Sequence, residues 1–584
     1  MNIGDVDLTN PDSFIEAVPF DYFRFLREQA PLTFSPRASD GGFWNVVRYA
    51  DITAIEKDVE GFTSRTNVSP MDTSEAQLAN TIDNSIILTD PPQHGFLRGS
   101  IRDAFVPKAV KRLEESMKVY ARNAIDAVIE TGACDLHDVA AYTPIEVVAD
   151  ILGVPAHDRP KLFEWANAMF GQLDPELSDH QRATLGGFQM MSYARRVTRR
   201  RRAKPTDDVF SMIANAVRDG RQLTDMEMGA TFIVLATAGN ETTRTQYLHG
   251  MAELIARPDV MAELRADPAL IPNAVEEMLR WTTPALGFAR KATRDHELHG
   301  QTIRQGERVM LWYVSGNRDE TVFPDPDSFD IRRANAAAKH LAFGASGGIH
   351  RCLGSMLAKA ELNAMFTESI MRLNDLQLDG PVRRLRSNFT NGIKHMPVRF
   401  TPGPRLGDSA DIAMYASQNN SASIAAAASA AAAAVQPTVV ENRDDGIQLV
   451  PIARATLKLG IPAVMPGTPR GMRMIVDVED ARWEGERLQA SQLSQPSGDW
   501  AVVSPDGTLQ VDVRTTLETD DGALIYVRYE GRSDYGRAGN SPIIVAPLFE
   551  TADPRYAWLN KVQAIAKGRA ANMGVLVYDI YEVR

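Results

Sequence analysis

Residues 340–354 read HLAFGASGGIHRCLG, a glycine-rich loop that contains one of the two cysteines in this chain of 584 residues. A cysteine thiolate is a good ligand for iron, and glycines let backbone N–H groups approach its sulfur closely. Residues 355–373 have a strongly helical pattern, so Cys352 lies at a helix start, where the positive end of the dipole favours a thiolate. By itself the loop indicates either a thiolate ligand for haem iron or a buried, inert cysteine in a turn.

Length and composition limit the class of protein. A chain of 584 residues exceeds what one hydrophobic core usually holds, so at least two domains are expected. With 44% apolar and 24% charged residues and a net charge of -12, the composition is typical of a soluble globular protein, with no reason to expect a nucleic-acid partner. The opening MNIGDVDLTN lacks the features of a secretory signal, and no stretch has the pattern of a membrane-spanning helix. We therefore expect a cytoplasmic protein in which Cys134 and Cys352 are free thiols.

The spacing of apolar residues divides the chain. From residue 14 to about residue 270, apolar residues return every three or four positions, which predicts helices, and short alternating pieces after residue 290 predict small strands. Residues 417–434, SQNNSASIAAAASAAAAA, have almost nothing to bury and indicate a linker. Beyond them, a period of two with PDG and DDG turns predicts a small all-β barrel or sandwich. We predict one domain at 1–404, a linker at 405–443 and a second domain at 444–584.

Further motifs occur in a fixed order before the loop. They are DPPQHGFLR at 90–98, AGNETT at 238–243, EMLR at 277–280, and GNRD at 316–319 with FPDPDSFDIRR at 323–333. Together with the loop they resemble the cytochrome P450 superfamily, in the family's own chain order and over residues 1 to about 404. The resemblance implies a multidomain protein with a mainly α P450 fold that carries small β regions, followed by the all-β domain. It also implies a haem-thiolate monooxygenase.

The resemblance also implies roles for individual residues. Cys352 would be the proximal ligand of the iron of haem b, within a loop shaped by Phe343, Gly348 and Gly354. The haem propionates need cations once they leave bulk water; the candidates are His94, Arg98, Arg290 and His340. Glu277 and Arg280, one helical turn apart, would form a structural ion pair.

The loop departs from the family pattern FGxGxHxCxG in one respect. Ala345 stands seven residues before the cysteine, where the pattern has its aromatic residue, and Phe343 stands nine before, because the loop is two residues longer. Either Phe343 returns to cover the haem face, or the thiolate is less shielded and the potential of the iron shifts.

The stretch VLATAGNETTRTQ resembles the oxygen-activating helix of the family. Thr242 and Glu241 would form the pair that handles protons for O2, and Gly239 weakens the helix so that dioxygen and water enter. The neighbouring wall is apolar, which predicts an apolar substrate such as a terpenoid, a sterol-like molecule or a long alkyl chain. The residues expected in this wall are Ile233, Val234, Ala238 and Leu286.

Neither half of the chain has a dinucleotide fingerprint or a cysteine cluster. Resemblance to bacterial members therefore implies a separate ferredoxin and ferredoxin reductase, which would consume NAD(P)H. A positive face for an acidic donor is expected at Arg102, Lys108, Lys111, Arg112 and Arg351. Two alternatives stay open: a peroxide-driven peroxygenase, and a non-catalytic haem sensor with the β domain as its output.

Residues from about 446 onward resemble a bacterial family catalogued only as a domain of unknown function, a small calycin-like β-barrel. The segments that carry the resemblance include GTPRG at 467–471 and TDDGALIYVRYEG at 519–531. This domain binds substrate or product, catalyses a following step, or forms a homodimer. Some of its polar and aromatic residues either face inward as a pocket or alternate outward into water; they are Asp512, Arg514, Arg528, Tyr529, Glu550 and Trp558.

Overall fold

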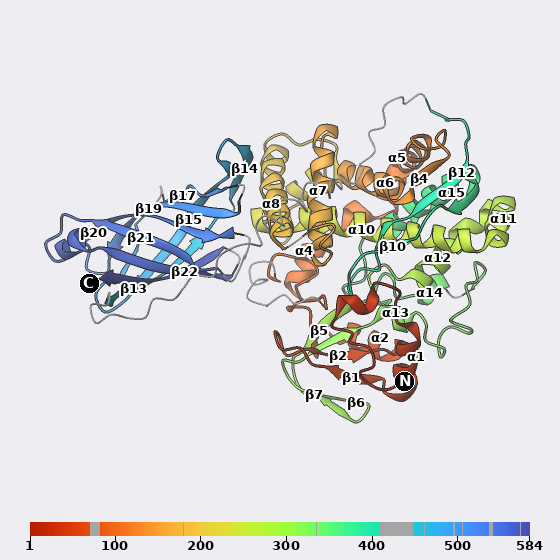
Figure 1. Cartoon of the computed structure of the whole chain (residues 1–584), viewed down its shortest axis with the longest axis horizontal. Helices are drawn as coiled ribbons and strands as arrows, with labels where there is room; N and C mark the ends of the chain where they lie inside the picture. The colour runs from red at the N-terminus through yellow and green to blue at the C-terminus, as the bar shows by residue number, and fades with distance from the viewer. Residues whose placement is uncertain are drawn as a thin grey trace. The chain divides into compact units, whose positions relative to one another are not determined.

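The computed structural model shows two compact units, one mainly helical and one all-β, and this confirms the predicted fold class. Figure 1 shows both, and each unit is described by itself. The predicted linker at 405–443 falls almost entirely outside the described residues. The residues described are 1–70, 82–178, 180–334, 336–407, 448–460, 462–493, 497–504, 506–535, 541–572 and 574–584.

The helical unit packs its helices around one large apolar core. The longest, α10 (Asp225–Ala256), begins with a capping box between Thr224 and Glu227, which satisfies backbone donors of the first turn. Its buried face packs with α5, α6, α12 and α15 in one cluster that includes Leu248 and Phe366. The other helices are α1 (Phe20–Gln29), α2 (Tyr49–Lys57), α4 (Gln93–Ile101), α5 (Pro107–Asp126), α6 (Leu136–Ile151), α7 (Arg159–Phe170), α8 (His180–Ala203), α9 (Val209–Asn215), α11 (Pro258–Ala266), α12 (Ile271–Thr282), α13 (Tyr313–Gly316), α14 (Ala336–Lys339) and α15 (Ser355–Arg372).

Small sheets flank these helices. The largest has the strand order β1-β2-β8-β5-β3, with β2 and β8 parallel, and it carries Arg290 on β5. The helical pattern predicted for residues 14–270 misses β1 and β2, because strands of four residues are too short to alter the periodicity. The strands of the helical unit are β1 (Leu32–Ser35), β2 (Phe43–Val46), β3 (Phe62–Thr63), β4 (Ala133–Asp135), β5 (Phe288–Ala292), β6 (His296–Leu298), β7 (Gln301–Ile303), β8 (Arg308–Leu311), β9 (Asn374–Leu378), β10 (Arg383–Arg384), β11 (Ile393–His395) and β12 (Pro397–Thr401).

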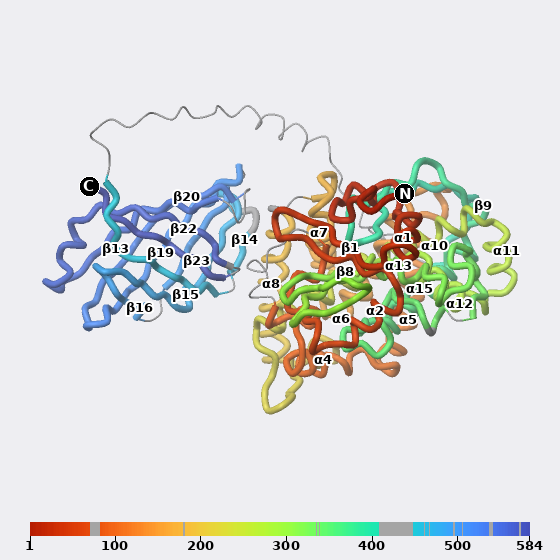
Figure 2. Tube along the Cα trace, turned by 90° about the horizontal axis from the view of Figure 1, so that it is seen from below, coloured from red at the N-terminus to blue at the C-terminus, as the bar shows by residue number. Residues whose placement is uncertain are grey.

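The β unit is a closed antiparallel barrel. Its strand order is β13-β23-β22-β21-β20-β19-β16-β15, and the barrel closes because β13 also pairs with β15. Figure 2 shows these strands as the blue part of the trace. The strands are β13 (Leu449–Leu459), β14 (Ala463–Thr468), β15 (Gly471–Glu484), β16 (Ala490–Gln492), β17 (Gly498–Asp499), β18 (Val502–Val503), β19 (Thr508–Thr519), β20 (Leu524–Asp534), β21 (Ile543–Glu550), β22 (Ala564–Asn572) and β23 (Val575–Val583).

Burial alternates along the barrel strands, with apolar residues inside. Of the polar residues singled out from the sequence, Arg514, Arg528 and Glu550 are exposed, and Asp512 is partly exposed and paired with Arg514 at 3.1 Å. Tyr529 instead points into the core, where it is 3% exposed.

Candidate active site

A cavity of about 260 Å³ lies inside the helical unit. Side chains of α4, α6, α10, α12 and α15 line it, together with β5 and the loop before α15. Most of the lining is apolar, and Cys352 opens onto it. The cavity therefore brings the thiol singled out in the sequence together with the helix that carries Thr242.

The loop before α15 brings Phe343 next to Cys352. The backbone N–H of Cys352 donates to the carbonyl oxygen of Phe343 at 2.9 Å, and both residues line the cavity. Gly344 and Gly347 have φ of +79° and +88°, a region that L side chains rarely adopt, so the chain turns sharply between them. The turn thereby places Phe343 beside Cys352 at one wall of the cavity.

The surroundings of the sulfur are electropositive. Cys352 lies below the outer surface of the protein but is exposed to the cavity, and this burial raises the pKa of its thiol. The N–H of Gly354 and the charges of Arg98 and Arg351 act in the opposite direction and lower that pKa in part. Gly354 is the residue that precedes α15, so the helix start also faces the sulfur. The second cysteine differs, since burial together with Asp135 and Asp138 raises the pKa of Cys134 to about 12.

Basic side chains gather at the same cavity. Arg98, Arg290 and His350 line it, and the ring of His94 lies 4.4 Å from the ring of His350. Burial, followed by the charge of Arg98, lowers the pKa of His94 to about 4. Burial and the neighbouring arginines also lower the pKa of His350. Within the described residues, Nε2 of His94 is buried without a hydrogen-bond partner.

His340, the fourth predicted cation, lies outside the lining of this cavity. Its Nε2 is 3.0 Å from Oε2 of Glu276, and its Nδ1 accepts the N–H of Ala342 at 3.2 Å. Both ring nitrogens of His340 are therefore engaged, whereas His350 lines the cavity, with its Nε2 2.9 Å from Oγ of Ser64. The HxC element of the family pattern was the signal in the sequence, because it holds His350 two residues before the cysteine.

Glu56, on α2, holds the loop and the cations together, and sequence reasoning missed it. Its carboxylate accepts from the hydroxyl of Tyr313 and from the N–H of Ala345, and it lies 3.3 Å from Arg290. Glu56 is 234 residues from Arg290 in the chain. A glutamate on an amphipathic helix has no feature in the local sequence that would indicate such a partner.

On α10, Thr242 and Glu241 point to different surroundings. Thr242 lines the cavity, and its hydroxyl donates to the carbonyl of Ala238 at 2.6 Å. Glu241 is buried and forms an ion pair with Arg244, and burial lowers the pKa of that arginine to about 10. The helix runs unbroken through Gly239, where an added Cβ would come within 2.9 Å of Val148 on α6. Gly239 thus permits close packing of α6 and α10, and no interruption of the helix is seen there.

Comparison with known proteins identifies this arrangement. The family model described as Cytochrome P450 matches residues 108–393. The steroid C26-monooxygenase of Rhodococcus jostii is 34% identical over 405 residues, which cover 68% of this chain and 84% of the relative. The chain belongs to the cytochrome P450 family. The linalool 8-monooxygenase of Pseudomonas putida is 33% identical over 68% of this chain and 99% of its own length.

A solved P450 of Mycobacterium marinum in complex with pseudoionone superposes with a TM-score of 0.64 at 35% identity, over 68% of this chain and 99% of that one. Residues 447–583 match a second model, described as Protein of unknown function (DUF3237). The protein is thus a P450 monooxygenase fused to a β-barrel, and the family implies haem and O2-dependent oxidation. The alternative of a non-catalytic sensor is not kept. None of the helices in the described part of the chain has the length and apolar character that a membrane crossing requires.

The residues present fit a haem. The thiol of Cys352 would supply an iron ligand, and the N–H of Gly354 faces its sulfur. Arg98, Arg290 and His350 line the cavity and would supply donors for the two propionates, and the ring of His94, with its unpartnered nitrogen, lies beside His350.

The apolar wall of the P450 cavity includes only part of the predicted set. Val234 and Ala238 line it, one helical turn apart on α10, but Ile233 is not among the lining residues. Leu286 is fully buried in a different cluster, with Phe14 and Trp312, and its neighbour Ala285 lines the cavity instead. Other lining residues that the sequence did not indicate include Ile86, Ile101, Phe105, Val148, Leu235 and Phe288.

Glu277 and Arg280 form a fully buried ion pair on α12. Two hydrogen bonds of 2.8 Å join them, and Arg333 adds a second cation at 3.1 Å from Glu277. Arg280 also donates to the carbonyl oxygens of Asn317, Pro326 and Ser328.

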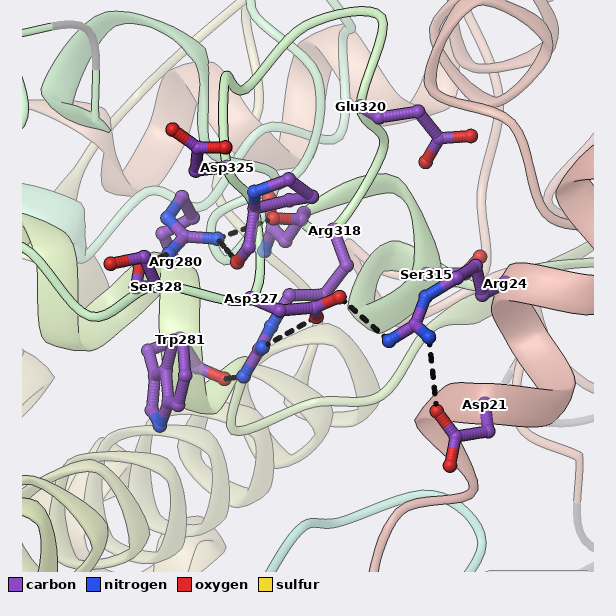
Figure 3. A network of polar contacts seen from close by, with 12 residues as sticks. Asp21, Arg24, Arg280, Trp281, Ser315, Arg318, Glu320, Asp325, Asp327 and Ser328 are labelled. Atoms are coloured by element: carbon purple, nitrogen blue, oxygen red, sulfur yellow. Dashed lines mark hydrogen bonds and ion pairs between the residues drawn. The ribbon is translucent and has the colours of Figure 1, made fainter.

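A second arginine extends this network, as Figure 3 shows. Arg318 donates to Asp327 at 3.1 Å, and Asp327 in turn accepts from Arg24 on α1 at 2.7 Å. Burial lowers the pKa of Arg318 to about 10. The network fixes the chain that leads to the loop around Cys352.

Proposed function

We propose that this P450 monooxygenase hydroxylates an apolar small molecule of the terpenoid, sterol-like or alkyl class, with Cys352 as the iron ligand of haem b. The observation that carries the proposal is one cavity in which the Cys352 thiol, three arginines and a mainly apolar wall lie together. The names of the relatives support the substrate class, because they include monooxygenases of steroids and linalool and a methyl-branched lipid omega-hydroxylase.

When bound, haem supplies the activation of dioxygen and the oxidation of a C–H bond. The chain would position that group: Arg98, Arg290 and His350 would donate to the propionates, with His94 beside His350. Phe343 would pack against the group near the sulfur, and Gly348 and Gly354 would let the backbone pass close to it. Val234 and Ala238 exclude water and hold the apolar substrate through contacts that a charged molecule would not tolerate.

Protons reach the reaction through α10. The hydroxyl of Thr242 holds a proton at Oγ1 inside the cavity, where it is anchored by the carbonyl of Ala238. Glu241 is the acid next to it in the chain, and its carboxylate moves a proton toward Oγ1 only when it turns away from Arg244. The ion pair with Arg244 thus keeps the Glu241 carboxylate turned away from the cavity between turnovers. Protons then enter the cavity mainly during turnover, and fewer of them are consumed in side reactions.

Electrons come from a separate ferredoxin and ferredoxin reductase. Support lies in the five basic residues predicted for the donor face, all of which are exposed: Arg102, Lys108, Lys111, Arg112 and Arg351. We place the protein in the cytoplasm, where a reducing environment keeps both cysteines as the free thiols that the structure contains.

The test is the spectrum of the ferrous protein with carbon monoxide. Wild type and the control Cys134→Ala should give the red-shifted Soret band of a thiolate ligand, and Cys352→Ala should lose it. A red-shifted band that survives in Cys352→Ala would remove the proposal. Spin-state titrations of the same protein with a terpene alcohol, a sterol and a long-chain alkane then rank the substrate classes.

A further inference from the structure

The interior of the barrel contains polar groups that the P450 reaction does not use. Trp483 and Tyr578 are each 2% exposed. Neither Nε1 of Trp483 nor the hydroxyl of Tyr578 has a hydrogen-bond partner among the described residues. Buried donors without a partner are rare and costly in folded proteins, so each calls for a physical reason.

Strand pairing places these two residues on either side of one position. Ala455 on β13 pairs with Trp483 on β15 and with Tyr578 on β23, so the two aromatic side chains flank one small residue on the inner face. Tyr529 on β20 lies close by, with its ring 5.6 Å from that of Tyr578 in an edge-on contact. All three aromatic residues line one internal space.

The walls of this space are apolar and partly small. Ala455 and Ala566 leave room that larger side chains would fill, and Val545, Pro547 and Ile580 complete the lining. No part of the space between these side chains is wide enough for a water molecule. Water therefore does not satisfy the donors. A molecule enters only if the tyrosine rings swing aside.

One acid faces the same interior. Asp499 on β17 pairs with Val513, which pairs with Tyr529, so both polar residues lie on the inner face two strands apart. Oδ1 of Asp499 accepts the N–H of Asp512 at 3.1 Å. Burial, followed by Tyr578 and Asp499, raises the pKa of Tyr529, so its hydroxyl stays a donor.

We propose that the barrel interior is a second small-molecule site, which takes a mainly apolar ketone or alcohol and binds its oxygen through Trp483 Nε1–H and the Tyr578 hydroxyl. Donors without partners select a ligand with an acceptor oxygen, and apolar walls select the rest of the molecule. The inference rests on the proposed function in one respect: hydroxylation of an apolar compound creates this oxygen, which the parent hydrocarbon lacks. The barrel thus takes product in preference to substrate.

The experiment uses the full-length haem-loaded chain labelled with 5-fluorotryptophan. The ¹⁹F line of Trp483 is assigned by its loss in Trp483→Phe. Cyclohexanone and methylenecyclohexane are the probes, because they differ only in an oxygen replaced by CH2. Cyclohexanone should shift the Trp483 line and bind at least tenfold more tightly than methylenecyclohexane, since one lost hydrogen bond is worth about that factor.

Variants separate recognition from folding. Tyr578→Phe should weaken cyclohexanone binding about tenfold. The control Tyr526→Phe, on the outer face of β20 and 39% exposed, should leave binding unchanged. Dispersed ¹⁹F lines show that each variant is folded, and Tyr529→Phe replaces Tyr578→Phe if the latter unfolds.

A Trp483 line that does not move with millimolar cyclohexanone overturns the inference, as does an equal response to both probes. A concentration-dependent dimer together with a silent Trp483 line would favour the assembly role instead. The Soret band is recorded on the same samples. Turnover at the haem with a silent barrel removes this inference alone, whereas a responsive barrel without turnover removes the proposed function alone.

Discussion

Asp499→Asn tests the electrostatics of the barrel interior quantitatively. Asp499 is 7% exposed, and burial raises its pKa from 3.8 to about 6. A tenfold change in proton affinity corresponds to about 1.36 kcal/mol, so the charged form of Asp499 destabilises the folded barrel by about 3 kcal/mol relative to the unfolded chain. Asn retains an Oδ1 that accepts the N–H of Asp512, so the substitution removes the charge and keeps the hydrogen bond.

The sign follows from the raised pKa. Below pH 4 the carboxyl is protonated in both the folded and unfolded states, so wild type and Asp499→Asn should be equally stable. Between pH 4 and 6 the unfolded state loses its proton first, and the wild-type barrel loses stability. Above pH 6 the full difference is reached, and Asp499→Asn should be more stable than wild type by about 3 kcal/mol.

Hydrogen exchange, measured by mass spectrometry on the full-length protein, reports the stability of the barrel separately from that of the helical unit. Peptides from β19 report its opening free energy after correction for intrinsic exchange at each pH. Asp520→Asn is the control, because Asp520 is exposed and paired with Arg482, and it should not change β19 exchange. The reasoning would be refuted if Asp499→Asn had the same effect at pH 4 and pH 8, or if it stabilised only at the acid end.

Two further substitutions test the helical unit. Glu277→Gln should destabilise the helical unit by about 3 to 5 kcal/mol, because the substitution leaves buried arginine charge unpaired. Urea unfolding measures this loss of stability. The control Glu263→Gln, at a partly exposed position, should change stability far less. Thr242→Val should lower kcat at least tenfold with little change in substrate Kd, because it removes a proton donor and keeps the cavity shape. Thr237→Val is the control for this substitution. The Thr237 hydroxyl also donates to a carbonyl one turn earlier in the helix, that of Ile233 at 2.7 Å, but Thr237 does not line the cavity. An equal loss of kcat in both variants would contradict the role of Thr242.

Local patterns in the sequence were enough to predict contacts within one element. Glu277 and Arg280 are three residues apart on a helix, so helix geometry permits the ion pair that the family resemblance implies. The barrel strands followed from a period of two, but that period left open which face is the inner one, and the structure places Arg514 and Arg528 on the outer face. Closure of the barrel was not derivable in this way, because the pairing of β13 with β15 joins strands that are not neighbours along the chain.

The phase of α10 explains why the predicted apolar wall was partly misplaced. Val234 and Ala238 are four residues apart and share a face, whereas Ile233 is turned by about 100° from Val234. An apolar residue next to a motif does not reveal which face of the helix it lies on, because apolar side chains face the core as well as the cavity. The same holds for Leu286, which is as apolar as a wall residue but packs against Trp312.

The choice between histidines has a different basis. His340 and His350 both lie in the loop, and only the HxC element of the family pattern singles out His350. The difference arises from partners on other elements: Glu276 on α12 engages His340, and Ser64 lies 2.9 Å from Nε2 of His350. Such partners are set by tertiary packing, which a single sequence does not reveal.

The two interiors differ in the kind of polar group that lines them. In the P450 unit the lining near Cys352 includes the cations Arg98 and Arg290, which suit the acidic edge of a haem; in the barrel Trp483 and Tyr578 are neutral donors without partners, which suit a single oxygen. Because both units belong to one chain, each haem domain that forms product is matched by one barrel. Apolar walls with two neutral donors then favour the oxygenated product over the parent hydrocarbon, which offers no acceptor to Trp483 and Tyr578.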